Sequence, residues 1–275
     1  MFTSGGSEAN NLALKGLFFP QRDRPSHIVT SRIGHSAILA PCRFLGRLGA
    51  NVPCVPVDGS ARVDPDDVRK AITRDTFLNS IMHANNEVGT IQPIAEIAKV
   101  ARAHGVPMYT DAAQSAGKIP TNVDALGVDL LSIAGHKLYA PKGIGALYIR
   151  RGIVLEPLIH GAGHEGGRRA GTESALLTAG LGKACEIARP DLGVPATRRL
   201  QVRFWDRLRA MFGDRVALNG HIDARLPNTL TVSFAGQVGA DILTRMPEVA
   251  ASTGSACHSA GIMLSPVLEA MGVPP

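Results

Sequence analysis

The stretch DLLSIAGHKLYAPKG, residues 129–143, joins an apolar strand to a pair of polar side chains. The run 130–134 is apolar enough to be a buried strand, and His136 and Lys137 follow it almost at once. Lysine is among the residues least often fully buried, so a lysine at the tip of a core strand suggests a chemical role. We interpret this strand as a rigid mount for Lys137.

The chain around this stretch alternates short apolar runs with helical patterns, from about residue 28 to residue 150. Unpatterned apolar strands separated by helices are typical of an α/β domain with a largely parallel sheet. Asp64 is expected to cap one helix and Gly105 to end another. The expected strands are 27–31, 51–57, 77–84, 106–112, 128–135 and 143–150, and the expected helices are 36–49, 64–72 and 94–105.

Two domains are expected. Residues 1–190 form a large α/β domain that ends with a helix at 173–188, and RPDLGVP, residues 189–195, reads as a hinge. Residues 191–275 form a partial small α/β domain with a strand at 225–236 and a helix from residue 239.

The composition is that of an ordinary soluble protein, with 275 residues, 45% hydrophobic and 19% charged. No apolar run approaches the roughly 18 residues of a membrane helix, and the N-terminus does not resemble a signal peptide. We therefore expect a cytoplasmic protein with no membrane partner. The cysteines Cys42, Cys54, Cys185 and Cys257 form no CxxC pair, which argues against a zinc site or a disulfide framework.

The formal net charge is +6, and many of the arginines fall within residues 198–215. They interleave with apolar residues at helical spacing, which favours the solvated face of a helix. Aromatic residues make up only 4% of the chain, so a stacking platform for nucleic acid has little support. Attraction for an acidic partner or an anionic cofactor stays open.

Polar side chains gather where the expected strands end, which is where open α/β sheets bind ligands. Asp111 and Asn86 end two of these strands, and Lys137 follows a third. TSGGSEANNLALKG, residues 3–16, adds a glycine turn that leads into a helix with Ser7 near its start. Free N–H groups and the helix dipole at such a start attract phosphate. Taken singly, each feature also fits a cap or a surface residue.

Together these groups match the needs of pyridoxal 5'-phosphate. This cofactor requires a lysine for a Schiff base, a carboxylate beside the pyridine nitrogen and a phosphate cup. Asp111 would keep the ring nitrogen protonated, because a nearby negative charge raises the pKa of a cation. Lys137 is expected to be withdrawn from water, which would lower its pKa and free its amine.

Six motifs carry a resemblance to a known family. TSGGSEANNLALKG, MHANNEVGTIQPI, TDAAQSAGK, GHKLYAPKGIGALYIRRG, RRAGTE and STGSACHS stand in the order found in the NifS/IscS-type cysteine desulfurases, members of aminotransferase class V. The resemblance extends from Phe2 to Val273. It implies the fold type I architecture of pyridoxal-phosphate enzymes and a homodimer.

The resemblance also assigns roles to individual residues. Lys137 would hold the cofactor as a Schiff base and act as a catalytic base, and His35 would stack on the cofactor ring. The cofactor-binding set implied by the motifs is Gly6, Ser7, His35, Asn86, Asp111, Gln114, His136, Lys137 and Thr172, with Thr172 reaching in from the other subunit; no metal site is implied.

Cys257, in a loop rich in serine, glycine and alanine, is the nucleophile that the resemblance implies. As a thiolate, the reactive form of cysteine, it would take sulfur from L-cysteine and leave L-alanine. The resulting persulfide would supply an acceptor protein for iron–sulfur clusters or thiolated tRNA.

The chain departs from the family pattern at three places. Ala134 replaces a serine that contacts phosphate, Gly166 replaces an arginine, and both an N-terminal segment and a C-terminal arginine that binds the substrate carboxylate are expected to be missing. Two alternatives therefore stay open. One is a selenocysteine lyase, and the other is a shortened, non-catalytic scaffold that binds the cofactor and dimerises.

Overall fold

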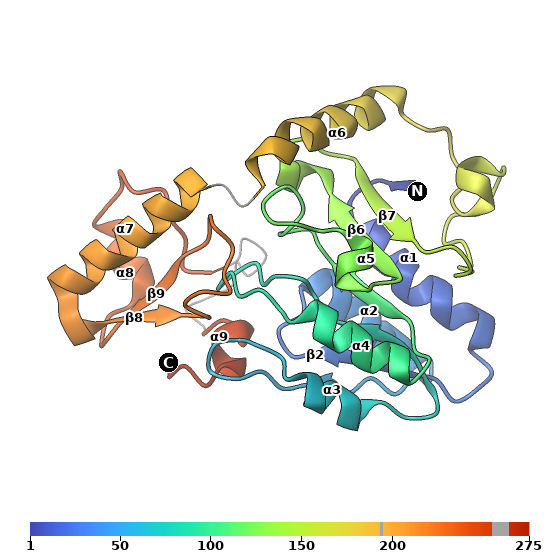
Figure 1. Cartoon of the computed structure of the whole chain (residues 1–275), viewed down its shortest axis with the longest axis horizontal. Helices are drawn as coiled ribbons and strands as arrows, with labels where there is room; N and C mark the ends of the chain where they lie inside the picture. The colour runs from blue at the N-terminus through green and yellow to red at the C-terminus, as the bar shows by residue number, and fades with distance from the viewer. Residues whose placement is uncertain (193–194, 255–263, 275) are drawn as a thin grey trace.

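The computed structural model describes residues 1–192, 195–254 and 264–274, which form a seven-stranded sheet and a separate two-stranded sheet. The order of the large sheet is β1-β7-β6-β5-β4-β2-β3 (Figure 1). Strands β2 to β6 run parallel, which confirms the expected sheet, whereas β7 runs antiparallel to both of its neighbours, β6 and β1. The bounds are β1 Phe2–Thr3, β2 His27–Ser31, β3 Cys54–Val55, β4 Thr76–Ser80, β5 Met108–Asp111, β6 Leu130–Ala134 and β7 Gly145–Ile149.

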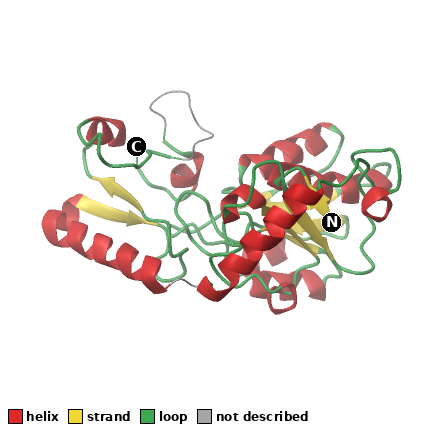
Figure 2. Ribbon diagram, turned by 90° about the horizontal axis from the view of Figure 1, so that it is seen from above, coloured by secondary structure: helices red, strands yellow, loops and turns green. Residues whose placement is uncertain are grey.

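Helices cover both faces of this sheet, as the view from above shows (Figure 2). Successive side chains of a strand point to opposite faces, so Leu130 joins a core with α1 and α2, whereas Leu131 joins a core with α3 and α4. Both cores contain side chains from the apolar strands that the sequence predicts. The helices of this part are α1 Gly6–Phe18, α2 Ser36–Arg47, α3 Pro65–Ala71, α4 Ile94–Ala103, α5 Val123–Leu126 and α6 Ala175–Ala188.

Local signals mark where the helices begin and end. The Asp64 side chain accepts a hydrogen bond from the Asp66 N–H at 2.8 Å, which confirms the expected cap. Gly105 follows the end of α4 with φ +68°, a left-handed conformation that glycine adopts without steric cost. Both boundaries therefore follow from sequence.

The small sheet consists of β8, Val216–Asn219, and β9, Thr231–Phe234, paired antiparallel. A hydrogen bond from the His221 N–H to Thr90 Oγ1, 2.9 Å, ties this unit to the large one. The remaining helices are α7 Pro195–Phe212, α8 Gly239–Thr244 and α9 Pro266–Ala270. None of the helices in the described ranges combines the length and the apolar character needed to cross a membrane.

Helix α7 carries the arginine-rich sequence. Arg199, Arg203 and Arg207 are exposed, which confirms the interpretation of a solvated helix face. The opposite side packs on the small sheet, where the Phe212 and Phe234 rings meet edge to face at 5.2 Å between centroids.

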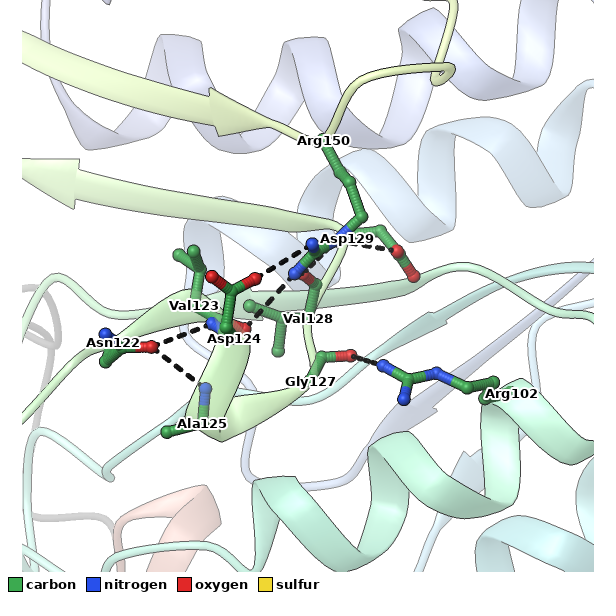
Figure 3. A network of polar contacts seen from close by, with 9 residues as sticks. All are labelled: Arg102, Asn122, Val123, Asp124, Ala125, Gly127, Val128, Asp129 and Arg150. Atoms are coloured by element: carbon green, nitrogen blue, oxygen red, sulfur yellow. Dashed lines mark hydrogen bonds and ion pairs between the residues drawn. The ribbon is translucent and has the colours of Figure 1, made fainter.

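Arg150, at the end of β7, anchors the beginning of β6 (Figure 3). Its guanidinium lies 2.9 Å from Asp124 Oδ1 and 3.3 Å from Asp129 Oδ1, and it donates to the Val128 carbonyl at 2.8 Å. These contacts fix the end of β6 opposite to Lys137, so the strand is held as a rigid mount.

Candidate active site

Asp111, the last residue of β5, is the buried acid of the site and is only 6% exposed. Its Oδ2 accepts a hydrogen bond from Asn10 Nδ2 at 2.8 Å, and its Oδ1 accepts one from the Ala113 N–H at 2.9 Å. Within the described residues it forms no ion pair. Burial raises the pKa of this carboxyl, against the opposing effects of the two hydrogen bonds and of the charge of His35. A cationic group beside Asp111 would offset the cost of burying its charge.

His35 lies close enough to Asp111 for its charge to act on that carboxyl. It is the N-cap of α2, and its Nδ1 accepts a hydrogen bond from the Ala37 N–H at 3.1 Å. Since Nδ1 is an acceptor, the neutral ring carries its proton on Nε2. The half-buried imidazole is therefore fixed in both position and tautomer.

Gly6 and Ser7, the predicted phosphate cradle, lie at the start of α1. Gly5 precedes the helix and has no side-chain cap, so the first N–H groups are left for another acceptor. Close packing against β7 holds this turn in place. Gly145 of β7 approaches Gly5 so closely that a Cβ atom at position 145 would lie 2.7 Å from the Gly5 Cα. A Cβ on Gly6 would lie 3.1 Å from that of Ala134, so the cradle adjoins the end of β6.

Lys137 and His136 lie in a short 3-10 turn, Gly135–Leu138, directly after β6. Both side chains are exposed in this chain, so the prediction that Lys137 is withdrawn from water is wrong. The physical reason is that β6 ends at Ala134, and the turn carries the next residues out of the sheet. Burial, followed by the charges of Lys137 and Lys142, lowers the pKa of His136, which favours the neutral imidazole.

Gln114 is half-buried and is held by Lys118, a residue that the sequence analysis missed. Lys118 Nζ donates to the Gln114 carbonyl at 2.9 Å and to its Oε1 at 3.3 Å. Burial, and then the charge of Lys137, lowers the pKa of Lys118 to about 8. The structure thus brings these three residues together. Gln114 and Lys118 both lie in the motif TDAAQSAGK, residues 110–118, so the sequence held a signal for this contact.

Asn86 is half-buried, and its neighbour Asn85 is fully buried. Asn85 Oδ1 accepts hydrogen bonds from the N–H groups of Glu87 and Val88, at 2.8 and 3.0 Å. Asn85 therefore shapes the loop after β4, and that loop presents Asn86.

Thr172 is exposed and lines a hollow of about 90 Å³ with Phe2, Thr3 and Gly143. None of the other predicted cofactor residues lines this hollow.

A second residue that the sequence analysis missed is Glu8, in the first turn of α1. Its carboxylate accepts hydrogen bonds from Arg169 Nε at 3.0 Å and from the Ser4 N–H at 2.8 Å. This pair ties the loop that carries Thr172 to the phosphate cradle, and no local pattern in the sequence signals it.

The cysteines divide into two groups. Cys257 lies outside the described residues. Burial raises the pKa of each of the other three thiols, Cys42 to about 12, so none of them is activated as a thiolate.

These residues fit pyridoxal 5'-phosphate. A buried carboxylate that forms no ion pair with a described residue suits a protonated pyridine nitrogen, and the start of α1 suits a phosphate. Lys137 has an exposed side chain in the turn directly after β6, Lys118 holds Gln114, and His35 lies near Asp111.

The aminotransferase class-V family model matches residues 1–273. The chain belongs to the aminotransferase class-V family. Cysteine desulfurase IscS of Dictyoglomus turgidum is 48% identical over the whole chain, which spans 70% of that relative. Cysteine desulfurase IscS of Methanosarcina thermophila is 45% identical over 99% of the chain and 68% of its own length.

Solved structures agree with this assignment. A NifS-like protein matches with a TM-score of 0.90 and 35% identity, over 100% of this chain and 73% of its own. SspA in complex with cysteine matches with a TM-score of 0.88 and 39% identity, over 99% of this chain and 77% of its own. The large sheet with its two helical layers is thus the fold type I architecture, and this class-V family member is a pyridoxal-phosphate protein.

Proposed function

We propose that this class-V family member is a cysteine desulfurase. In the net reaction, L-cysteine and the Cys257 thiol give L-alanine and a Cys257 persulfide, with one sulfur atom transferred and no external oxidant or reductant. The observation that carries the proposal is the buried Asp111 beside His35 and Asn10, in a chain 48% identical to a cysteine desulfurase.

Pyridoxal phosphate, when bound, supplies an electron-accepting ring for the substrate's Cα carbon. Asp111 would hold the ring nitrogen protonated, and Gly6, Ser7 and His136 would bind the phosphate. Gln114, oriented by Lys118, and Asn86 would contact the ring, and Thr172 would complete the phosphate site across a subunit interface.

Lys137 would carry the proton in this reaction. Its amine would take the proton from the substrate Cα and return one to the product carbon, a role that an exposed lysine in the turn directly after a rigid strand can fill. His35 would stack on the ring, and when neutral it carries its proton on Nε2. The Cys257 thiolate would attack the substrate sulfur, and the carbon–sulfur bond would break.

We also propose the partners. The enzyme would act as a homodimer, in which the exposed Thr172 would reach the site of the other subunit. It would pass sulfur to an acceptor protein for iron–sulfur cluster or thio-cofactor assembly. A cytoplasmic location suits the free thiols Cys42, Cys54 and Cys185, since the cytoplasm keeps thiols reduced.

The experiment is a quantitative assay of L-alanine and sulfide formed from L-cysteine by the chain loaded with pyridoxal phosphate, with a thiol reductant added to release the persulfide sulfur of Cys257 as sulfide. The Lys137→Ala variant should form no alanine. Cys257→Ser should retain the cofactor absorbance and lose sulfide production, whereas Cys185→Ser, which removes an exposed thiol elsewhere, should behave as the wild type.

Alanine formation that survives Lys137→Ala would overturn the proposal, and so would a loaded wild type that makes no alanine. A parallel assay with L-selenocysteine identifies a selenocysteine lyase, for which alanine would form from that substrate alone.

A further inference from the structure

Asn10 links Asp111 to a buried cluster of hydroxyl groups. It lies in α1, is 2% exposed, and donates from Nδ2 to Asp111 Oδ2 at 2.8 Å. Its Oδ1 accepts from the Tyr109 hydroxyl at 2.7 Å and from the Ser132 hydroxyl at 2.6 Å. Tyr109 and Ser132 are fully buried on the neighbouring strands β5 and β6. Every polar atom of the Asn10 side chain is thus paired within the core.

The Asp111 carboxylate fixes the orientation of the Asn10 amide. A flipped amide would place its carbonyl oxygen against the carboxylate oxygen that now accepts from Nδ2. That contact is repulsive, and the buried Asp111 would lose a hydrogen-bond donor. In the orientation observed, Oδ1 faces the Tyr109 and Ser132 hydroxyls, which are also 2.8 Å from each other.

Asn10 is also the side chain that best supports the charge of Asp111. The carboxylate accepts one backbone N–H, from Ala113, and one side-chain N–H, from Asn10. Tyr109 stays a neutral donor to Asn10, because burial, followed by the charge of Asp111, raises the pKa of its hydroxyl well above the usual range. A protonated His35 would also favour the charge of Asp111.

We infer that Asn10 is a positioning residue for the cofactor: held by Tyr109 and Ser132, it orients Asp111 and keeps it ionised, so that Asp111 can hold the pyridine nitrogen protonated. The inference rests on the proposed function only for the expected change in the rate of alanine formation. Its effect on the ring nitrogen requires only that the cofactor binds.

The test is nitrogen-15 NMR of the chain loaded with cofactor labelled at the pyridine nitrogen, together with steady-state kinetics. The wild type should show a protonated nitrogen. Asn10→Leu keeps the side-chain size and removes the donor, so the signal should move toward the unprotonated position while absorbance shows that the cofactor is bound. For alanine formation, kcat should fall about tenfold and KM should change less than about threefold.

The matched control is Asn11→Leu, which alters the next residue of the same helix, whose Nδ2 donates only to the Ser7 carbonyl in the described contacts. It should leave the nitrogen signal unchanged. The double variant Tyr109→Phe with Ser132→Ala frees the Asn10 amide to rotate and should give an intermediate shift. If Asn10→Leu does not fold, the nitrogen signal of the double variant tests the inference instead.

An Asn10→Leu protein with a wild-type nitrogen signal, or an equal shift in Asn11→Leu, would overturn the inference. A wild type with a protonated nitrogen and no alanine formation would instead overturn the proposed function, so the two failures are distinguishable.

Discussion

Lys118 Nζ lies 2.9 Å from the carbonyl oxygen of Gln114 and 3.3 Å from its Oε1. One lysine thus fixes both the backbone and the side chain of a residue proposed to contact the cofactor ring. The pKa of Lys118 is lowered to about 8 by burial and by the charge of Lys137.

Replacing Lys118 by methionine should weaken cofactor binding about fivefold, because about one kcal/mol of orienting hydrogen bonding to Gln114 is lost. A fluorescence titration of the unloaded protein measures this dissociation constant. Lys99→Met, at an exposed position of α4, is the control. Equal affinity in Lys118→Met and the wild type would show that Gln114 needs no support from Lys118.

Replacing Ala134 by serine should tighten cofactor binding. Ala134 adjoins Gly6 at the phosphate cradle, so a hydroxyl there can donate to the phosphate, for about 0.5–1.5 kcal/mol, or roughly twofold to tenfold in affinity. The same titration measures the change, and Ala103→Ser, at an exposed position of α4, should leave affinity unchanged. Weaker binding in Ala134→Ser would mean that the added hydroxyl is buried without a partner.

The Glu8–Arg169 pair should stabilise the fold in a pH-dependent way. Burial raises the pKa of Glu8, but the hydrogen bonds from Arg169 and Ser4 outweigh it and lower the pKa from its usual 4.5. The stabilisation is therefore present above about pH 4.5 and is lost as the pH falls through the folded-state pKa.

Glu8→Gln should reduce the free energy of unfolding by about 1.5 kcal/mol at pH 7, and by less at pH 3. Urea unfolding at the two pH values checks this, with Glu96→Gln, an exposed residue of α4, as the control. A loss that is the same at both pH values would show that the charge of Glu8 is not the cause.

His83 should make the fold less stable as the solution is acidified. It is 3% exposed, its Nδ1 lies 2.8 Å from Ser115 Oγ, and burial lowers its pKa from 6.5 to about 4. Between pH 4 and pH 6.5, the unfolded chain therefore binds a proton at this histidine more readily than the folded chain does. The contribution to stability is full above about pH 6.5 and declines as the pH falls toward 4, by at most about 3 kcal/mol.

His83→Asn should flatten the dependence of the unfolding free energy on pH between 4 and 6.5, and His160→Asn, at an exposed position, should not. Thermal or urea unfolding across this range provides the measurement. An unchanged slope in His83→Asn would assign the dependence to other groups.

Much of the large domain could be predicted because its signals are local. Apolar strands alternate with helices, Asp64 caps one helix, and Asp111 stands where a strand ends. The antiparallel direction of β7 has no such signal, since its residues read as any buried strand. The exposure of Lys137 follows from the turn after Ala134, which the strand pattern does not show.

The residues that support the site could not be predicted for a different reason. Asn10 is one of two adjacent asparagines in α1, and Asp111 lies 101 positions away, so only the fold brings the pair together. Glu8 and Arg169 are 161 positions apart. The domain boundary near residues 190–195 stays a prediction.

The most direct test of the central claim is a single turnover without reductant. The loaded chain is mixed with less than one equivalent of L-cysteine, L-alanine is quantified, and the peptide that carries Cys257 is weighed by mass spectrometry. The proposed function predicts one sulfur atom added to that peptide for each L-alanine formed, and neither product in Lys137→Ala. L-Alanine formed without sulfur on Cys257, or sulfur on Cys257 without L-alanine, would contradict it.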